Sequence, residues 1–242
     1  RMMADLKVAV WRYDGGGEPG MLQEFRVPRR QNQTVLDVVS EIQREQDPTL
    51  SYRFACRVGM CGSCAMMVNG RARWTCRTHV AKVVEGDLLT LRPLENLPNI
   101  KDLVCDMQPF FDKIERAGGV FKGTRTRQEP AARVDPLSPA RRFVDEAIEC
   151  IGCGVCYASC DLVSWNPDYL GPAALNRAWT LVQDERDTRT TERLQAVAGD
   201  AGCHACHSQM GCTQRCPKEL SPTASIAGLK REVARAALRG RL

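Results

Sequence analysis

Thirteen cysteines constrain this 242-residue chain most strongly, because most of them stand at spacings typical of metal ligands. Residues 150–160 read CIGCGVCYASC, and residues 206–217 read CHSQMGCTQRCP. The second run repeats the frame of the first, with Gln209 in place of one cysteine. Interleaved runs of this form hold two iron–sulfur clusters, and the fourth cysteine of each run ligates the cluster of the other. The spacing therefore predicts two clusters.

The crossing pattern divides these cysteines into two ligand sets. Four thiolates suit a 4Fe-4S cluster, and here they are Cys150, Cys153, Cys156 and the crossing Cys216. Three thiolates suit a 3Fe-4S cluster with Gln209 at the vacant corner, and here they are Cys160, Cys206 and Cys212. An alternative set recruits Cys203, which forms a further CxxC with Cys206. Zinc is disfavoured, because two overlapping runs ending in Cys-Pro are not a typical zinc pattern.

A third ligand set lies in the N-terminal part of the chain. Cys56, Cys61 and Cys64 have the spacing of a plant-type 2Fe-2S loop, with Cys76 as the later fourth ligand. Such a loop must leave backbone N–H groups free to point at sulfur, which favours small residues such as Gly59, Gly62 and Ser63. Cys105, in the apolar stretch LVCDM, is predicted to be a buried, inert thiol.

Composition restricts the class of protein. The chain is 43% apolar and 26% charged, which is typical of a soluble globular protein with two small domains. Thiolate ligands favour a reducing compartment over disulfide formation. The net charge of +5 is modest and spread out, so no nucleic-acid partner is expected. No window approaches the roughly 18 to 20 apolar residues of a membrane span, so any membrane contact is expected to be peripheral.

Hydrophobic patterning predicts an N-terminal domain over residues 1–105. Segments 6–13 and 21–28 alternate apolar and polar residues around a glycine-rich turn, which predicts a β-hairpin. Thr34 is the expected N-cap of a helix that ends before Pro48. Further strands are expected near 65–68 and 87–94. These elements predict a small mixed sheet crossed by one helix, the β-grasp pattern.

The remainder of the chain divides into a connector and a helical domain. Residues 106–142 are expected to be the connector, because 118–142 is rich in Gly, Pro and Arg. Residues 143–242 are expected to be helical, with helices over 172–184 and 222–238. The last helix is expected to bury one apolar face, formed by Ile226, Leu229, Val233 and Ala237. The fold class is therefore α+β, with a plant-type ferredoxin domain followed by an all-helical, bacterial-ferredoxin-like domain.

The order of these motifs resembles the iron–sulfur subunit of succinate dehydrogenase and fumarate reductase, the complex II family. The resemblance covers nearly the whole chain and rests on the segments CRVGMCGSCAMMVNGRARWTC, CIGCGVCYASC, WNPDYLGPAAL, DERDTR and CHSQMGCTQRCPKELSP. It implies an electron-transfer subunit of a succinate:quinone oxidoreductase or quinol:fumarate reductase, which serves the tricarboxylic acid cycle. The dicarboxylate active site then lies on another subunit.

The resemblance also implies partners and a location. Electrons pass between a flavoprotein subunit that carries FAD and a quinone at membrane-anchor subunits, through 2Fe-2S, 4Fe-4S and 3Fe-4S clusters in that order. The complex then sits on the cytoplasmic face of a bacterial inner membrane, or on the matrix side in a mitochondrion. Trp165 and His207 match the family's quinone-contacting positions. The sequence departs from the family at Asp161, where proline is usual, and at Ser164, where ubiquinone-using members have another tryptophan.

Two other classes of protein remain as alternatives. One is a soluble redox adaptor of a quinone-independent fumarate reductase, although such enzymes usually add a further cysteine-rich domain. The other is a structural metalloprotein whose clusters only hold the fold. Three different predicted clusters on one chain favour electron transfer over a purely structural role.

Overall fold

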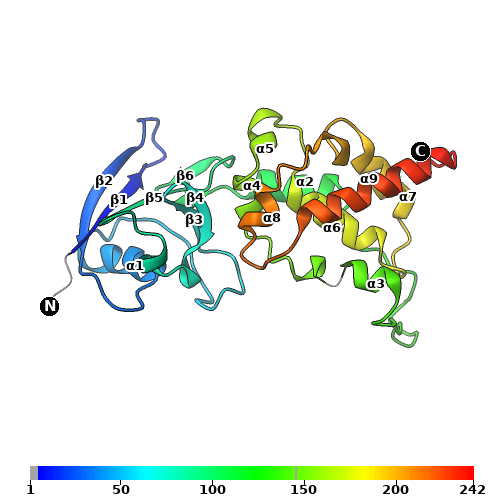
Figure 1. Cartoon of the computed structure of the whole chain (residues 1–242), viewed down its shortest axis with the longest axis horizontal. Coiled ribbons are helices and arrows are strands. Elements are labelled where there is room, and N and C mark those ends of the chain that lie inside the picture. The colour runs from blue at the N-terminus through cyan, green and yellow to red at the C-terminus, as the bar shows by residue number, and fades with distance from the viewer. Residues whose placement is uncertain (1–4, 145) are drawn as a thin grey trace. The chain divides into compact units, whose positions relative to one another are not determined.

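The computed structural model describes residues 5–144 and 146–242, which form two compact units (Figure 1). The first unit contains the residues up to Met107 together with Ile151–Ser159. The second contains Gln108–Cys150 and Cys160–Leu242. The contact boundaries therefore differ from those expected from sequence, because part of the first C-terminal cysteine run belongs to the N-terminal unit.

The first unit is built on a five-stranded mixed sheet. Strands β1 (Leu6–Arg12) and β2 (Met21–Val27) form the expected antiparallel hairpin, with Leu6 paired to Val27. The order across the sheet is β2-β1-β5-β3-β4, and β5 runs parallel to β1. The other strands are β3 (Ala65–Val68), β4 (Arg71–Trp74) and β5 (Leu88–Arg92). The expected strands are thus present, whereas β4 and the small β6–β7 pair (Asn99–Lys101, Val104–Cys105) had not been predicted.

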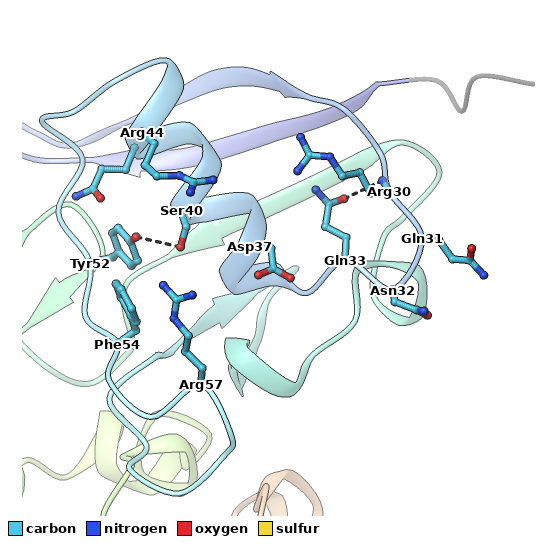
Figure 2. A pocket seen from close by; sticks show the side chains of 11 residues that line it. Arg30, Gln31, Asn32, Gln33, Asp37, Ser40, Arg44, Tyr52, Phe54 and Arg57 are labelled. Carbon is cyan, nitrogen blue, oxygen red and sulfur yellow. Dashed lines mark hydrogen bonds between the residues drawn. The ribbon is translucent and has the colours of Figure 1, made fainter.

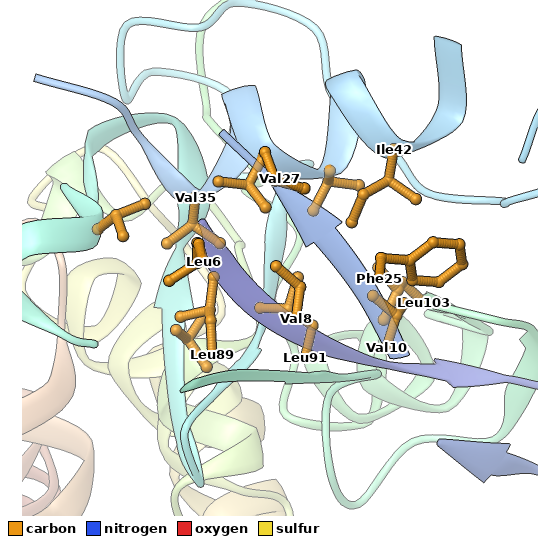
Figure 3. Packing of buried hydrophobic residues seen from close by; sticks show 14 of the residues in the cluster. Leu6, Val8, Val10, Phe25, Val27, Val35, Ile42, Leu89, Leu91 and Leu103 are labelled. Carbon is orange, nitrogen blue, oxygen red and sulfur yellow. The ribbon is translucent and has the colours of Figure 1, made fainter. Parts of the chain in front are cut away.

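One helix, α1 (Val35–Glu45), packs on this sheet. Thr34 caps it as expected: its hydroxyl accepts from the Asp37 amide, and the Asp37 carboxylate accepts from the Thr34 amide in return. The core between helix and sheet contains residues from both, shown in Figure 3. It includes Leu6, Val8, Val35, Ile42 and Leu91, each with essentially no exposed surface. This burial fixes which face of the hairpin lies inward.

The segment Ile151–Ser159 joins the first unit through apolar packing. Val155 and Ala158, on the short helix α4 (Val155–Ala158), pack with Met67, Leu94 and Cys105. The Asn96 side chain also donates to the Tyr157 carbonyl oxygen at 3.0 Å. Sequence spacing assigned this run to the helical domain, but the apolar side chains of α4 have their partners on the sheet domain.

The described part of the second unit is helical, with α2 (Gln108–Arg116), α3 (Pro139–Val144), α5 (Asp161–Trp165), α6 (Pro172–Val182), α7 (Thr190–Ala198), α8 (Gly211–Arg215) and α9 (Pro222–Leu238). Short 3-10 turns cover Ala147–Glu149 and Cys203–Ala205. In the first unit they cover Thr75–Arg77 and Val80–Lys82. The helix α2 lies within the segment expected to be connector, and it contacts α6. Residues 121–130, by contrast, are all exposed.

Helix α9 has the predicted bounds and packs against α6. Gly228 permits this approach, because a Cβ there would lie 2.6 Å from the Trp179 ring. Ile226, Leu229 and Val233 are buried as predicted. The prediction for Ala237 is wrong: Ala237 is exposed and Ala236 is buried instead. The last turn has few neighbours, since Leu238 is 89% exposed.

A buried ion pair fastens the segment that follows α2. The guanidinium of Arg193 on α7 pairs with the Asp187 carboxylate, with an N–O distance of 2.6 Å and almost no exposure of either side chain. Arg193 also donates to the carbonyl oxygens of Gly118 and Val120, and Asp187 accepts from the Lys122 amide. The two side chains thereby hold residues 118–122 against the helical unit.

Candidate metal centres

The N-terminal cysteine loop directs backbone N–H groups at sulfur. The amides of Met60 and Cys61 donate to Cys56 Sγ at 3.2 and 3.3 Å. The Cys76 amide donates to Cys64 Sγ at 3.5 Å. Such donors stabilise thiolates and sulfides, so the four cysteines fit a 2Fe-2S cluster in the chemistry of their surroundings as well as in their spacing.

Small residues of the loop have the roles that the sequence suggested. Gly59 and Gly62 have φ angles of 73° and 72°, which favour glycine, and Gly59 packs directly against the Trp74 ring. Ser63 Oγ donates to Cys61 Sγ at 3.2 Å. That hydrogen bond, assisted by Cys56, lowers the pKa of Cys61 to about 6, which favours the thiolate. Burial, with Cys64 adding to it, raises the pKa of Cys76 to about 11.

The same loop contacts the first C-terminal cysteine run within the first unit. A Cβ on Gly62 would lie 2.5 Å from Cys153 Cβ, so only glycine allows this approach. Cys153 follows Gly152 and precedes Gly154, both of which have positive φ angles. The predicted 2Fe-2S loop and two predicted 4Fe-4S ligands, Cys153 and Cys156, therefore belong to one compact unit. The other two predicted ligands, Cys150 and Cys216, belong to the second unit.

The second unit brings together the three cysteines predicted to bind a 3Fe-4S cluster. Burial raises the pKa of Cys160, and the neighbouring thiols of Cys212 and Cys206 raise it further. The loop after Cys206 turns through left-handed residues at Ser208 and Met210, and the Ser208 amide donates to Cys206 Sγ at 3.4 Å. This loop thus resembles the N-terminal one in directing an N–H group at sulfur.

Buried polar side chains surround these thiols, and sequence reasoning missed them. Tyr169 is 1% exposed; burial raises its pKa, as do the three cysteine thiols and its hydrogen bond to Cys206. Lys113 of α2 is 6% exposed; burial lowers its pKa, whereas Asp168 and Cys160 raise it. The sequence signal for Tyr169 was its place in the WNPDYLGP segment, but nothing marked Lys113 as close to a cysteine.

Helix α9 also reaches this cysteine group. Lys230 Nζ donates to the Cys206 carbonyl oxygen at 2.6 Å. Thr223, in the first turn of α9, lies 3.5 Å from Cys212 Sγ. Cys203 is fully buried and burial raises its pKa, as it does for the buried Cys105.

The residues predicted to contact quinone lie at the surface of the second unit. Trp165, the last residue of α5, is 69% exposed, and His207 is also exposed. Gln209, predicted at the vacant corner of the 3Fe-4S cluster, is exposed as well. Tryptophan side chains are highly buried on average in folded proteins, so the exposure of Trp165 is unusual. The sequence could suggest these residues, but not their exposure.

A polar pocket of about 420 Å³ lies beside the N-terminal cysteine loop (Figure 2). Arg57, from the loop itself, lies over the Phe54 ring at 4.7 Å, and the Tyr52 ring stacks on the same Phe54 ring with 5.4 Å between the ring centroids. Arg44 lines the pocket from α1, and Arg30 lines it from the segment before α1. In the same cysteine loop as Arg57, the side chains of Val58 and Met60 are 60% and 61% exposed. Arginine and exposed apolar side chains together are typical of a protein-binding surface.

The described residues contain no group of three or more His, Cys, Asp and Glu side chains arranged to hold a single metal ion. They also contain no helix that is long and apolar enough to cross a membrane. The cysteine groups, their N–H donors and their left-handed turns are the features of an iron–sulfur protein.

Comparison with known proteins identifies the family to which the chain belongs. Residues 7–112 match the 2Fe-2S iron–sulfur cluster binding domain family, and residues 149–221 match the 4Fe-4S dicluster domain family. The mitochondrial succinate dehydrogenase [ubiquinone] iron–sulfur subunit 1 of Oryza sativa subsp. japonica is 35% identical over 223 residues, covering 91% of this chain and 79% of that protein. The chain belongs to the family of succinate dehydrogenase iron–sulfur subunits.

Two solved structures are similar to this chain. A chain of the Mycobacterium smegmatis Sdh1 complex in the apo form is 28% identical, with a TM-score of 0.82 and 96% of each chain covered. A hypothetical protein from Helicobacter pylori shares the fold, with 15% identity and a TM-score of 0.58 over 95% of this chain and 40% of that one.

Proposed function

We propose that this chain is the electron-transfer subunit of a succinate dehydrogenase complex, relaying electrons between a flavoprotein subunit that carries FAD and a quinone at membrane-anchor subunits. The observation that carries the proposal is the contact between Gly62 and Cys153, which sets the 2Fe-2S loop directly against a 4Fe-4S ligand. A structural metalloprotein has no need of such closeness, whereas a relay does.

The ligand sets are those that spacing predicts, on a β-grasp, plant-type ferredoxin domain and a helical, bacterial-ferredoxin-like domain. We assign the 2Fe-2S cluster to Cys56, Cys61, Cys64 and Cys76. The 4Fe-4S cluster is assigned to Cys150, Cys153, Cys156 and Cys216, and the 3Fe-4S cluster to Cys160, Cys206 and Cys212. Bound clusters supply reversible one-electron storage. The protein's own contribution is to hold the thiolates, direct N–H groups at them and limit access of water.

The two ends of the relay are assigned from surface chemistry. The pocket formed by Arg57, Phe54 and Arg44, with the exposed Val58 and Met60, is the proposed contact for the flavoprotein. Its cationic and apolar groups suit an acidic partner surface with an apolar centre. The exposed Trp165 and His207 suit contact with quinone and the anchor. Such a complex lies on the cytoplasmic face of a bacterial membrane, or on the matrix side in a mitochondrion.

Purification of the native complex tests this function. We expect a flavoprotein to co-purify, three cluster signals in low-temperature electron paramagnetic resonance (EPR), and succinate-dependent reduction of a ubiquinone or menaquinone analogue. Assays with fumarate and reduced quinone measure the reverse direction. If no flavoprotein co-purifies under gentle extraction, the assignment as a complex subunit is wrong.

A further inference from the structure

The side chains beside Cys212 form a short hydrogen-bonded chain of two threonines. The oxygens of Thr213 and Thr223 lie 2.8 Å apart, and the backbone N–H of Thr223 donates to Thr213 Oγ1 at 3.2 Å. Cys212 Sγ lies 3.5 Å from Thr223 Oγ1 and 4.0 Å from Thr213 Oγ1. The group joins α8, which carries Cys212, to the first turn of α9.

The direction of these hydrogen bonds follows from counting protons. A cysteine that ligates iron is a thiolate, which can only accept. Thr223, the nearer hydroxyl, must then give its single proton to Cys212 Sγ. The 2.8 Å contact therefore uses the proton of Thr213, whose oxygen also accepts from the Thr223 amide. Every donor then has one acceptor, whereas the reverse direction leaves the sulfur with only the 4.0 Å contact.

We infer that Thr223, oriented by Thr213, is a positioning residue that donates a hydrogen bond to Cys212 and thereby raises the reduction potential of the three-thiolate cluster. The inference rests on the proposed assignment of that cluster to Cys160, Cys206 and Cys212. Reduction adds negative charge, part of which resides on the thiolates. A donor to the sulfur stabilises the reduced form more than the oxidised form, so it favours reduction.

Two features of the surroundings strengthen this effect. Cys212 is 8% exposed, so solvent competes little for its sulfur. Thr223 follows Pro222 in the first turn of the 17-residue helix α9, at the end of the helix where the helix dipole is positive. Low exposure strengthens the hydrogen bond to the sulfur, and the helix dipole stabilises added negative charge in the same sense as the hydroxyl.

The test compares hydroxyl-free and hydroxyl-retaining variants in the whole complex. In Thr223→Val the reduction potential of the cluster, measured by EPR-monitored redox titration, should fall. At the wild-type midpoint the ratio of reduced to oxidised cluster should be about tenfold lower, which corresponds to roughly 59 mV for one electron. Thr223→Ser should keep the wild-type potential. Thr180→Val is the matched control, because it removes a buried hydroxyl that donates only to the Arg177 carbonyl oxygen.

A second measurement reports the hydrogen bond directly. Electron–nuclear double resonance (ENDOR) of the oxidised cluster should detect an exchangeable proton, lost on transfer to D₂O, that is absent in Thr223→Val and present in Thr223→Ser. If Thr223→Val does not assemble the cluster, Thr213→Val serves instead, and should lower the potential by a smaller amount because Thr223 keeps its hydroxyl but loses its orientation.

The outcomes separate this inference from the proposed function. A normal 3Fe-type signal with the same potential and the same exchangeable proton in Thr223→Val would overturn the role of Thr223 and leave the ligand set intact. The absence of any 3Fe-type signal in the anaerobically purified wild-type complex would overturn the ligand set itself, and the inference with it.

Discussion

Replacing Arg193 with methionine should release the segment 118–122 from the helical unit. Methionine keeps most of the side-chain volume but removes the contacts with three partners: the ion pair with Asp187 and the hydrogen bonds to the carbonyl oxygens of Gly118 and Val120. Removing one member of a buried pair costs about 3 to 5 kcal/mol, because the other charge is left without a partner. Asp187 keeps the N–H donors of Lys122 and Arg189, so we expect the lower value, about 3 kcal/mol.

Hydrogen exchange measured by mass spectrometry reports this loss locally. About 3 kcal/mol corresponds to roughly a hundredfold faster exchange of the Lys122 and Thr188 amides, at about 1.4 kcal/mol per factor of ten. Arg186→Met is the control, since it breaks a more exposed pair with Asp184 and should cost less than about 1 kcal/mol. An unchanged exchange rate in Arg193→Met would refute the reasoning.

Acid should also weaken the attachment of residues 118–122 to the helical unit in the wild-type protein. Although burial alone would raise the pKa of Asp187, hydrogen bonds from Arg193, Lys122 and Arg189 hold it below its ordinary value. A carboxyl with a lowered folded-state pKa contributes stability that is present above its unfolded pKa of about 3.9 and is lost as the pH falls through the folded value. The double variant Arg193→Met with Asp187→Asn should recover part of the stability that Arg193→Met alone loses, because no unpaired charge remains.

Three further predictions concern the sites. Trp165→Leu should raise the KM for quinone and leave succinate-dependent reduction of an artificial acceptor unchanged; a wild-type KM would remove Trp165 from the quinone site. Arg57→Glu should weaken retention of the flavoprotein on size exclusion at moderate salt, whereas Arg26→Glu on β2 should not; equal retention would place the flavoprotein elsewhere. Gly62→Ala should reduce 2Fe-2S content more than Gly70→Ala, because both have positive φ angles but only Gly62 lies against a neighbouring loop; equal cluster content would show that backbone strain alone matters.

The local elements of the fold could be predicted because their signals are local. The capping residue Thr34, the alternation in β1 and β2, and the Pro222 start of α9 each depend on neighbours within a few residues. Eleven of the thirteen cysteines predict three ligand sets from their spacing, which is also a local signal. The error at Ala237 has the opposite origin, because the burial of a helix end depends on whether another element reaches it.

Only the tertiary structure decided which segments meet. The chain by itself predicted the iron–sulfur ligand sets and their order, since thiolate spacing is a property of the sequence. It could not reveal that α4 packs on the sheet domain, that Gly62 lies against Cys153, or that Tyr169, Lys113 and Thr223 lie beside the group of Cys160, Cys206 and Cys212. These contacts join residues far apart in the chain, and they arise from the burial of apolar surface, which sequence spacing does not encode.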